Sequence, residues 1–168
     1  MAPTESEGWE QVGDELNAAV EAFWRASVEG AGIDGPHTAW AFGDTPEMAD
    51  ELGLLVRDGP KRATTSLLSW YEGDEPETLP KAADLIVVLD GRGDPICVIR
   101  TVKVEVRPFG EVDEAFAWVE GEGDRSLAYW RDAHIRFFAG EGRPVDEETP
   151  VVLETFEQLW PHRDEGPV

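Results

Sequence analysis

Apolar positions recur along the chain at spacings that distinguish helices from strands. From Glu10 onward, apolar side chains return every three or four residues, which predicts one face of a helix. Gly30 and Gly32 end this pattern. A second helix is predicted to begin at Pro46, because proline suits the first helical position, and to end at Gly59. The pattern thus predicts two amphipathic helices in the first part of the chain.

Other segments combine strand-like runs with two further helices. Residues rich in β-branched and aromatic side chains predict strands at 38–42, 64–71, 85–89, 96–106 and 151–160. Helices are predicted near 112–119 and from Asp124, as the capping residue, to about Phe138. Four or five strands with helices segregated from them predict an α+β domain with a small barrel-like sheet.

The long strand predicted at 96–106 has two different faces, because side chains along a strand alternate between them. Arg100 interrupts one largely apolar face, whose members are Val98, Arg100, Val102, Val104 and Val106. The other face carries Thr101, Lys103 and Glu105 among its side chains.

The chain has the size of one domain, with 168 residues and a mass of 18.6 kDa. We predict a single domain at 9–161 between tails at 1–8 and 162–168. Cys97 is the only cysteine, which excludes an internal disulfide and a cysteine zinc cluster. The longest apolar run, 85–89, is far below the roughly 20 residues of a membrane helix. Because the N-terminus also lacks the pattern of a signal peptide, we expect a cytoplasmic protein.

The chain is strongly acidic, with 36 Asp and Glu against 14 Lys and Arg, a formal net charge of −22. A field of this sign repels nucleic acid and anionic lipid. We therefore expect no membrane partner, and any contact with nucleic acid requires a local basic patch.

The most suggestive polar cluster lies where the second helix meets the next strand. Lys61 and Arg62 are followed by the hydroxyls of Thr64, Thr65 and Ser66. At this spacing Lys61 can share a site with Thr64 and activate its hydroxyl, which is a weak nucleophile without such help. An exposed turn lysine beside ordinary strand threonines gives the same pattern. Because Lys61 is predicted to lie in a turn, we expect its removal to cost little stability.

Three carboxylates alternate with glycines before the last predicted helix, namely Glu120, Glu122 and Asp124. A carboxylate at this point can polarise the lysine or activate water. Their spacing does not match a calcium-binding loop, and the glycines form neither a dinucleotide fingerprint nor a P-loop. A flexible acidic linker with a helix cap is the alternative interpretation.

None of the three histidines has the spacing of a metal motif, and His134 lies on the apolar face of a predicted helix. We interpret His134 as a hydrogen-bonded core histidine, and we expect no metal and no organic cofactor. The aromatic candidates for a ligand cleft are Trp40, Trp70 and Tyr71.

The segment around Lys61 resembles a known signature. Residues 58–68, DGPKRATTSLL, are similar to the GxKxxT motif of the ASCH (activating signal cointegrator homology) domain. The similarity covers most of 23–161, and it continues in 80–84, 97–101, 120–131, 134, 137–138 and 152–156.

The resemblance implies a PUA-like fold, a small β-barrel flanked by short helices, with a cleft for RNA or nucleotides. Some bacterial relatives are ribonucleases, and a shorter relative is an amidohydrolase that removes the acetyl group of N4-acetylcytidine with a lysine, a threonine and a glutamate. Through the signature, Lys61 and Thr64 match the lysine and the threonine. Glu120 and Glu122 are both candidates for the glutamate. The candidate substrate-binding residues are Gly59, Arg62, Thr65, Ser66, Arg100, Trp40 and Tyr71.

Three functions fit these residues. In a metal-independent hydrolase of an acylated nucleoside, Thr64 attacks the acyl carbonyl, Lys61 activates Thr64, and a glutamate orients Lys61 or relays protons. In a ribonuclease acting on single-stranded RNA, Lys61, Arg62 and Arg100 hold phosphate. The third function is a non-catalytic module that binds RNA or a modified nucleotide. The net charge favours a small neutral nucleoside over long RNA.

Overall fold

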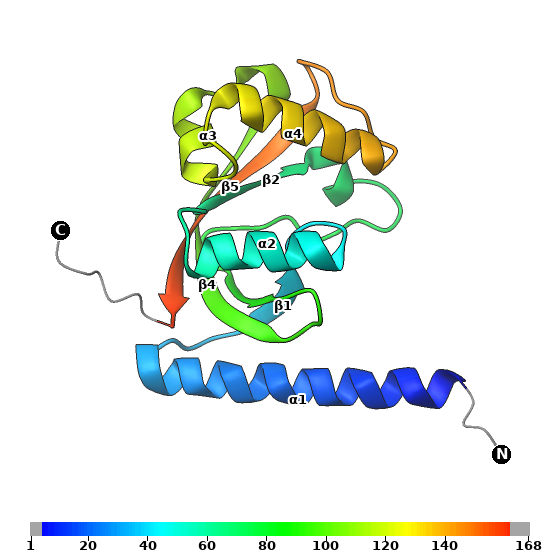
Figure 1. Cartoon of the computed structure of the whole chain (residues 1–168), viewed down its shortest axis with the longest axis vertical. Coiled ribbons are helices and arrows are strands. Elements are labelled where there is room, and N and C mark those ends of the chain that lie inside the picture. The colour runs from blue at the N-terminus through cyan, green and yellow to red at the C-terminus, as the bar shows by residue number, and fades with distance from the viewer. Residues whose placement is uncertain (1–4, 162–168) are drawn as a thin grey trace. The chain divides into compact units, whose positions relative to one another are not determined.

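The computed structural model describes residues 5–161, with side chains from residue 17 onward. The predicted tails fall partly outside it, since residues 1–4 and 162–168 are not among the described residues, whereas residues 5–8 of the predicted N-terminal tail belong to a helix. The helices and strands follow one another as α1 (Glu5–Ala31), β1 (His37–Ala41), α2 (Pro46–Arg57), β2 (Ala63–Leu67), β3 (Leu85–Leu89), β4 (Pro95–Pro108), α3 (Glu114–Glu120), α4 (Leu127–Gly140) and β5 (Pro150–Trp160) (Figure 1).

Five strands form one sheet in the order β1-β3-β4-β5-β2. β1 pairs with β3 in parallel, and β2 pairs with β5 in antiparallel orientation. This half-barrel sheet with helices confirms the prediction of an α+β fold of the PUA-like type.

The described chain divides into two compact units. The first consists of 5–57, 85–99 and 158–161, and the second of 58–84 and 100–157.

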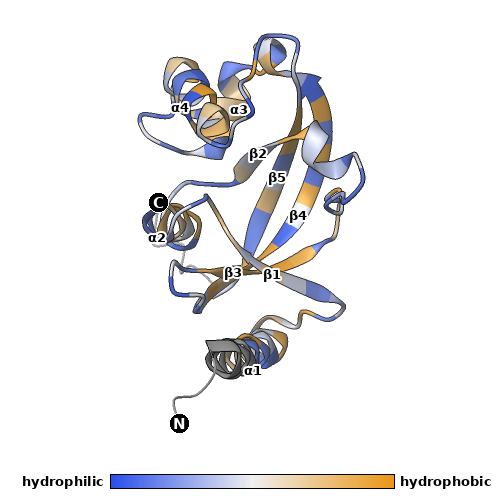
Figure 2. Ribbon diagram, turned by 90° about the vertical axis from the view of Figure 1, so that its right-hand side faces the viewer, coloured by the Kyte–Doolittle hydropathy of each residue, from blue (hydrophilic) through white to orange (hydrophobic). Residues whose placement is uncertain are grey.

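The core of the first unit forms between α1 and β3. Trp24 of α1 is buried and stacks on the ring of His37 in β1, with ring centroids 4.0 Å apart. Four successive residues of β3 are buried, and β3 is one of the hydrophobic segments coloured orange in Figure 2. The buried apolar members of this core are Val20, Trp24, Ile33, Leu85, Val87 and Val98.

The core of the second unit forms where α3 and α4 meet β2 and β5. Trp130 of α4 stacks on Phe109, with ring centroids 5.1 Å apart. The helices pack against one face of the two strands, because the buried apolar members are Leu67, Phe109, Val112, Ala117, Trp130, Phe138, Val151 and Leu153. This packing also fixes the orientation of the polar side chains on β2.

Two predicted boundaries were wrong. The strand predicted at 64–71 ends at Leu67, and a 3-10 turn over Leu68–Tyr71 follows it. The helix predicted from Asp124 begins three residues later, at Leu127, because the hydroxyl of Ser126 accepts the hydrogen bond from the backbone N–H of Tyr129.

On β4, the apolar face and the buried face do not coincide. Val102 is 54% exposed and Val106 is also exposed, whereas Thr101, on the predicted polar face, is 1% exposed. Thr101 can be buried because its hydroxyl donates a hydrogen bond to Glu154, so no polar group is left unpaired.

Phe138→Ala should lower the free energy of unfolding by about 3–5 kcal/mol, since it opens a cavity in the core of the second unit. Ile135→Ala is the matched control, because Ile135 lies on the same helix and is 45% exposed. Urea denaturation of both variants measures the difference. Equal losses would contradict the packing of α4.

Candidate functional site

The side chains of β2 separate into two sets. Ala63, Thr65 and Leu67 are buried on the side that faces α3 and α4, whereas Thr64 and Ser66 are half-buried on the opposite face. The two adjacent threonines of the signature therefore contribute to two different groups of polar side chains.

Lys61 immediately precedes β2 and is 1% exposed. Its Nζ donates to the carbonyl oxygen of Ala63 at 2.8 Å and to Glu122 Oε1 at 2.6 Å. Glu120 Oε1 lies 3.7 Å from the same nitrogen. The interpretation of Lys61 as an exposed turn lysine was wrong, because two carboxylates, one from the last residue of α3 and one from the loop after it, neutralise its charge inside the protein.

Glu120 is as deeply buried as Lys61 and accepts several hydrogen bonds. Its Oε2 accepts from the Thr65 hydroxyl at 2.8 Å and from Trp130 Nε1. Its Oε1 lies 3.1 Å from His134 Nε2. We call these residues, Lys61, Thr65, Glu120, Glu122, Trp130 and His134, the Lys61 cluster.

Both nitrogens of the His134 ring face acceptors. Nδ1 lies 2.7 Å from the carbonyl oxygen of Trp130, and Nε2 faces the carboxylate of Glu120. Because the carbonyl oxygen of Trp130 and an ionised Glu120 carboxylate can only accept, the protonated ring, with a proton on each nitrogen, is the form that satisfies both partners. His134 is thus the hydrogen-bonded core histidine predicted from the sequence, and it adds a second cation beside Glu120.

The charges of the cluster shift the pKa values of its members. Burial alone would raise the pKa of Glu120, but the charges of His134 and Lys61 and the hydrogen bonds from His134 and Trp130 lower it to about 2. Burial alone would lower the pKa of His134, but the charge and hydrogen bond of Glu120 raise it. Glu120 and His134 therefore each favour the charged form of the other.

The end of α3 brings both glutamates to Lys61. Asp113 caps the first turn of this helix, and Gly121 ends it in the left-handed conformation with a φ of 74°. A side chain at Gly121 would approach the backbone of Pro60 and Lys61 to within 2.8 Å. Glycine is therefore required here for the chain to turn against Lys61.

A second polar group lies on the other face of β2. Thr64 pairs directly with Glu154 of β5, so the two side chains share a face. Glu154 Oε1 accepts a hydrogen bond from the Thr101 hydroxyl at 2.6 Å. Burial raises the pKa of Glu154. We call Thr64, Glu154 and Thr101 the Thr64 row.

Glu154 was missed by the sequence analysis of candidate residues. The signal that could have identified it is a single carboxylate within the strongly apolar run VVLETF at 151–156. An acidic residue in a buried strand is unusual unless it is paired or functional.

Ser66 and Tyr71 extend the polar face of β2. The hydroxyl of Ser66 lies 2.8 Å from the phenol oxygen of Tyr71. Burial raises the pKa of Tyr71, so the phenol stays protonated at neutral pH and can donate a hydrogen bond. These two predicted binding residues are therefore adjacent to each other.

The predicted cationic residues have local partners. Arg62 donates from Nη1 to the carbonyl oxygen of Lys61 at 2.6 Å. Arg100 forms an exposed ion pair with Glu157, with an Nε to Oε1 distance of 2.9 Å. Gly59 is half-buried in the turn before Lys61.

The predicted aromatic residues do not form one group. Trp40 belongs to the first unit, where its ring contacts Phe42 edge-on with centroids 4.7 Å apart. Trp70 packs on Phe138 in the apolar core of the second unit. Tyr71, in contrast, forms a hydrogen bond with another predicted site residue, Ser66.

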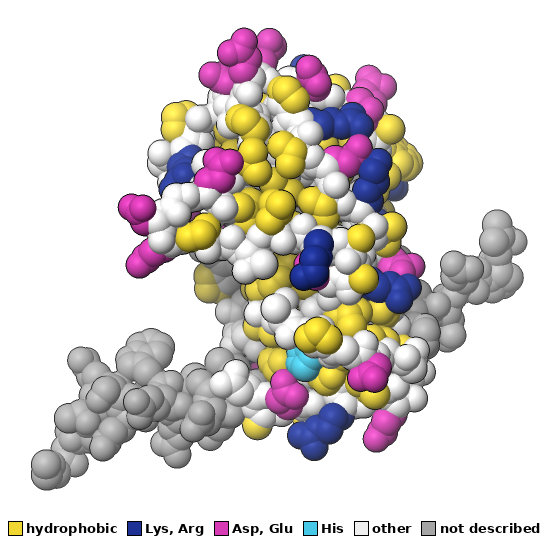
Figure 3. Space-filling model, turned by 180° about the vertical axis from the view of Figure 1, so that it is seen from behind, with side chains coloured by type: hydrophobic (Ala, Val, Ile, Leu, Met, Phe, Trp, Pro, Cys, Tyr) yellow, Lys and Arg dark blue, Asp and Glu magenta, His cyan; other side chains and the backbone are white. Residues whose placement is uncertain are grey.

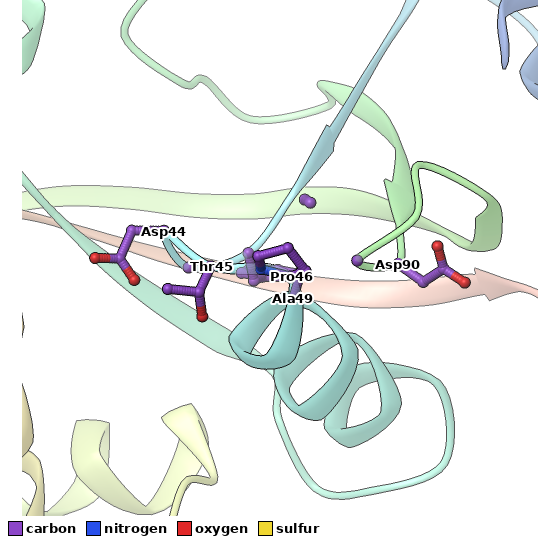
Figure 4. Close-up of a pocket in the computed structure, with 9 residues that line it drawn as sticks. Asp44, Thr45, Pro46, Ala49 and Asp90 are labelled. Carbon is purple, nitrogen blue, oxygen red and sulfur yellow. The ribbon is translucent and has the colours of Figure 1, made fainter. Parts of the chain in front are cut away.

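A pocket of about 240 Å³ lies in the first unit beside the start of α2 (Figure 4). Asp44, Thr45 and Asp90 are among its lining residues. None of the site residues predicted from the sequence lines this pocket. The candidate chemistry therefore resides in the second unit, around Lys61 and Thr64.

The view in Figure 3 shows Lys and Arg side chains dispersed among hydrophobic and acidic ones.

Among residues 5–161, no helix combines the length and the apolar character needed to cross a membrane.

Comparisons with known proteins give consistent results. A family model described as ASCH domain matches residues 38–159. The crystal structure of an ASCH domain from Lactobacillus crispatus JV V101 is 31% identical, with a TM-score of 0.76, and the match covers 84% of this chain and 94% of that chain. A crystal structure of an Enterococcus faecalis V583 protein is 36% identical, with a TM-score of 0.71 and coverages of 89% and 94%. The search of curated proteins finds no match.

Lys61→Met should lower the free energy of unfolding by about 3–5 kcal/mol, because it leaves the negative charges of Glu120 and Glu122 without their buried cation. Lys103→Met is the control, since Lys103 is exposed and pairs with Glu105 at the surface. Thermal and urea unfolding measure both. If Lys61→Met unfolded at the same temperature and urea concentration as the wild type, the ammonium group would not be needed for folding.

Glu120→Gln should destabilise the protein by about 3 kcal/mol between roughly pH 5 and pH 6.5. The pKa of Glu120 in the folded state is lowered. The ionised Glu120 therefore stabilises the fold fully above pH 4.5, and this stabilisation disappears as the pH falls towards 2. The pKa of His134 in the folded state is raised. The protonated His134 therefore stabilises the fold fully below pH 6.5, and this stabilisation disappears as the pH rises through the raised pKa.

The difference in unfolding free energy between wild type and Glu120→Gln should therefore decrease on both sides of this window. Urea unfolding across the pH range measures it, with the exposed Glu148→Gln as the control. A difference that does not vary with pH would contradict the charged Glu120–His134 pair.

Proposed function

Since the chain belongs to the ASCH domain family, we propose that it binds a modified nucleoside and hydrolyses an amide on it without a metal ion, as an amidohydrolase of the N4-acetylcytidine type. The family suggests an RNA-related ligand. The observation that supports hydrolysis is the position of the buried Lys61 ammonium, which is hydrogen-bonded to Glu122 and to the peptide group that leads into Thr64.

Thr64 is the proposed nucleophile. It is the half-buried hydroxyl on the face of β2 opposite the apolar core. Thr65 does not suit this role, because its hydroxyl is buried and donates to Glu120. The carbonyl of Ala63 belongs to the same peptide group as the backbone nitrogen of Thr64, so the Lys61 ammonium contacts the peptide group that leads into the proposed nucleophile.

Glu122, rather than Glu120, is the proposed proton relay. Glu120 has its two oxygens engaged by Thr65, Trp130 and His134, and its lowered pKa keeps it ionised. Glu122 is hydrogen-bonded to Lys61 at 2.6 Å, and its side chain is 19% exposed. Glu122 can therefore exchange a proton with both Lys61 and water. Glu120 is a positioning residue that holds the cluster together.

The proposed reaction proceeds in two steps. Lys61 gives a proton to Glu122, takes the hydroxyl proton of Thr64, and the Thr64 oxygen bonds to the acyl carbon. The bond from the acyl carbon to nitrogen breaks, the leaving nitrogen takes the proton from Lys61, and Glu122 returns its proton to Lys61. Water then attacks the acyl-threonine ester, which releases the carboxylic acid and restores the Thr64 hydroxyl.

The charge of the chain favours a small neutral ligand over the ribonuclease alternative. Phosphodiester chemistry requires cations that are available to phosphate. Lys61 is engaged by two glutamates, and Arg100 is paired with Glu157. With a net charge of −22, long RNA meets repulsion as it approaches the protein.

Thr64→Val and Glu122→Gln should each reduce the turnover of N4-acetylcytidine by at least about 100-fold, because they remove the nucleophile and the proton relay. Thr64 is half-buried on the face of β2 opposite the apolar core, so Thr64→Val should change the melting temperature little. Glu122→Gln removes a partner of the buried Lys61 ammonium and should lower the melting temperature, so the rates are compared at a temperature at which both variants are folded. Thr38→Val and Glu148→Gln are the matched controls, since both residues are exposed and lie outside the site. Chromatographic detection of cytidine in the presence of EDTA measures the rates.

A labelled single-stranded RNA incubated in parallel distinguishes the alternatives. Deacetylation that persists in Thr64→Val would refute Thr64 as the nucleophile. RNA cleavage that requires Lys61, without deacetylation, would establish the ribonuclease alternative. Ligand binding without either reaction would identify a binding module.

A further inference from the structure

Glu154 is a buried carboxyl group to which the proposed reaction assigns no role. The residue is 6% exposed, and it lies in the middle of β5 within an apolar run. Ionisable side chains are rarely so deeply buried without partners that compensate for the loss of water.

The two oxygens of Glu154 have different surroundings. Oε1 accepts the hydrogen bond from Thr101, which fixes the orientation of the carboxyl group. For Oε2, the described part of the chain provides no hydrogen-bond donor. Oε2 is not one of the fully buried, unpartnered polar atoms of the described residues, so it remains open to a donor from outside the protein. A ligand that carries an N–H group is therefore a natural partner for Oε2.

The strand register places this open oxygen beside the proposed nucleophile. Thr64 and Glu154 are directly paired between β2 and β5, and side chains paired in this way are about 5 Å apart at their Cβ atoms. A ligand whose reacting carbon contacts Thr64 therefore has its adjacent atoms near Glu154. In an acylated amino group, the atom adjacent to the reacting carbon is the nitrogen.

We propose that Glu154 is the specificity-determining residue of this site, and that its open oxygen accepts a hydrogen bond from the exocyclic N–H group of a cytosine-type base. This inference rests on the proposed function, in that it assumes a nucleoside beside Thr64. Carboxylates accept from the amino group of cytosine, whereas uracil presents a carbonyl oxygen at the same position. Glu154 thus favours a base with an amino or acylamino group and disfavours uracil.

Thr101 acts through Glu154 rather than on the ligand. Its hydroxyl holds one carboxyl oxygen at 2.6 Å and so fixes the orientation of the carboxyl group. Asp84, whose negative charge contributes to the raised pKa of Glu154, is the other carboxylate that acts on this group.

The experiment measures the binding of cytidine and uridine to the whole chain by ligand-observed NMR titration. Wild type should bind cytidine about tenfold more tightly than uridine, because the wrong base leaves two acceptors facing each other. Glu154→Gln should bring this ratio to one or below, since the amide can rotate and donate to the uridine carbonyl. A merely structural role of Glu154 would weaken both nucleosides equally and leave the ratio unchanged.

Glu154→Asp is the second variant, for use if Glu154→Gln does not fold. It keeps the charge but withdraws the oxygen by one methylene group, so the cytidine preference should fall. Glu157→Gln is the control, because Glu157 lies on the same strand and pairs with Arg100 at the surface.

The outcomes separate this inference from the proposed function. Binding of both nucleosides with equal affinity, or an unchanged ratio in the Glu154 variants, would overturn the role of Glu154 alone. Binding of neither nucleoside by wild type would overturn the nucleoside ligand of the proposed function and the inference with it. A tenfold preference that is lost in Glu154→Gln supports both.

Discussion

The burial of one ammonium group is the constraint on which the second unit depends. Lys61 is withdrawn from water at the start of β2, and such a charge is tolerated only where opposite charge and hydrogen-bond acceptors surround it. The turn at the end of α3 provides both, through Glu120, Glu122 and the conformation of Gly121. The helix α4 then supplies the donors that complete Glu120. A core of packed side chains and a group capable of proton transfer are therefore built from the same residues.

The two glutamates beside Lys61 illustrate how burial divides chemically identical groups. Glu120 is surrounded by donors and carries a fixed charge, so it contributes geometry rather than chemistry. Glu122, two residues later, has one side towards Lys61 and one towards solvent. The same contrast separates Thr65 from Thr64, because successive residues of a strand point to opposite faces. Neighbouring identical residues thus differ in what they are able to do.

The elements that could be predicted from the sequence are those with local signals. The apolar run at 85–89 and the proline at position 46 identify β3 and the start of α2, whereas α2 ends at Arg57, before the predicted end at Gly59. The positions that could not be predicted depend on contacts between distant segments. Lys61 resembles a surface lysine because its partners lie 59 and 61 residues away. Thr101 resembles a polar-face residue until Glu154, 53 residues later, is placed beside it. Hydrogen bonds of this kind leave no periodic pattern in the sequence.

The alternation along β2 also determines where this chain can accept a change in its length. One residue inserted between Lys61 and Leu67 would exchange the two faces of the strand, so that Leu67 and the hydroxyls would trade surroundings. The exposed stretch at 72–79 has no such alternation to preserve. A spectroscopic label or an affinity peptide introduced there would leave the register of β2 and β5 intact. Length variation among related sequences is therefore expected to accumulate in that loop and to be excluded from the strand.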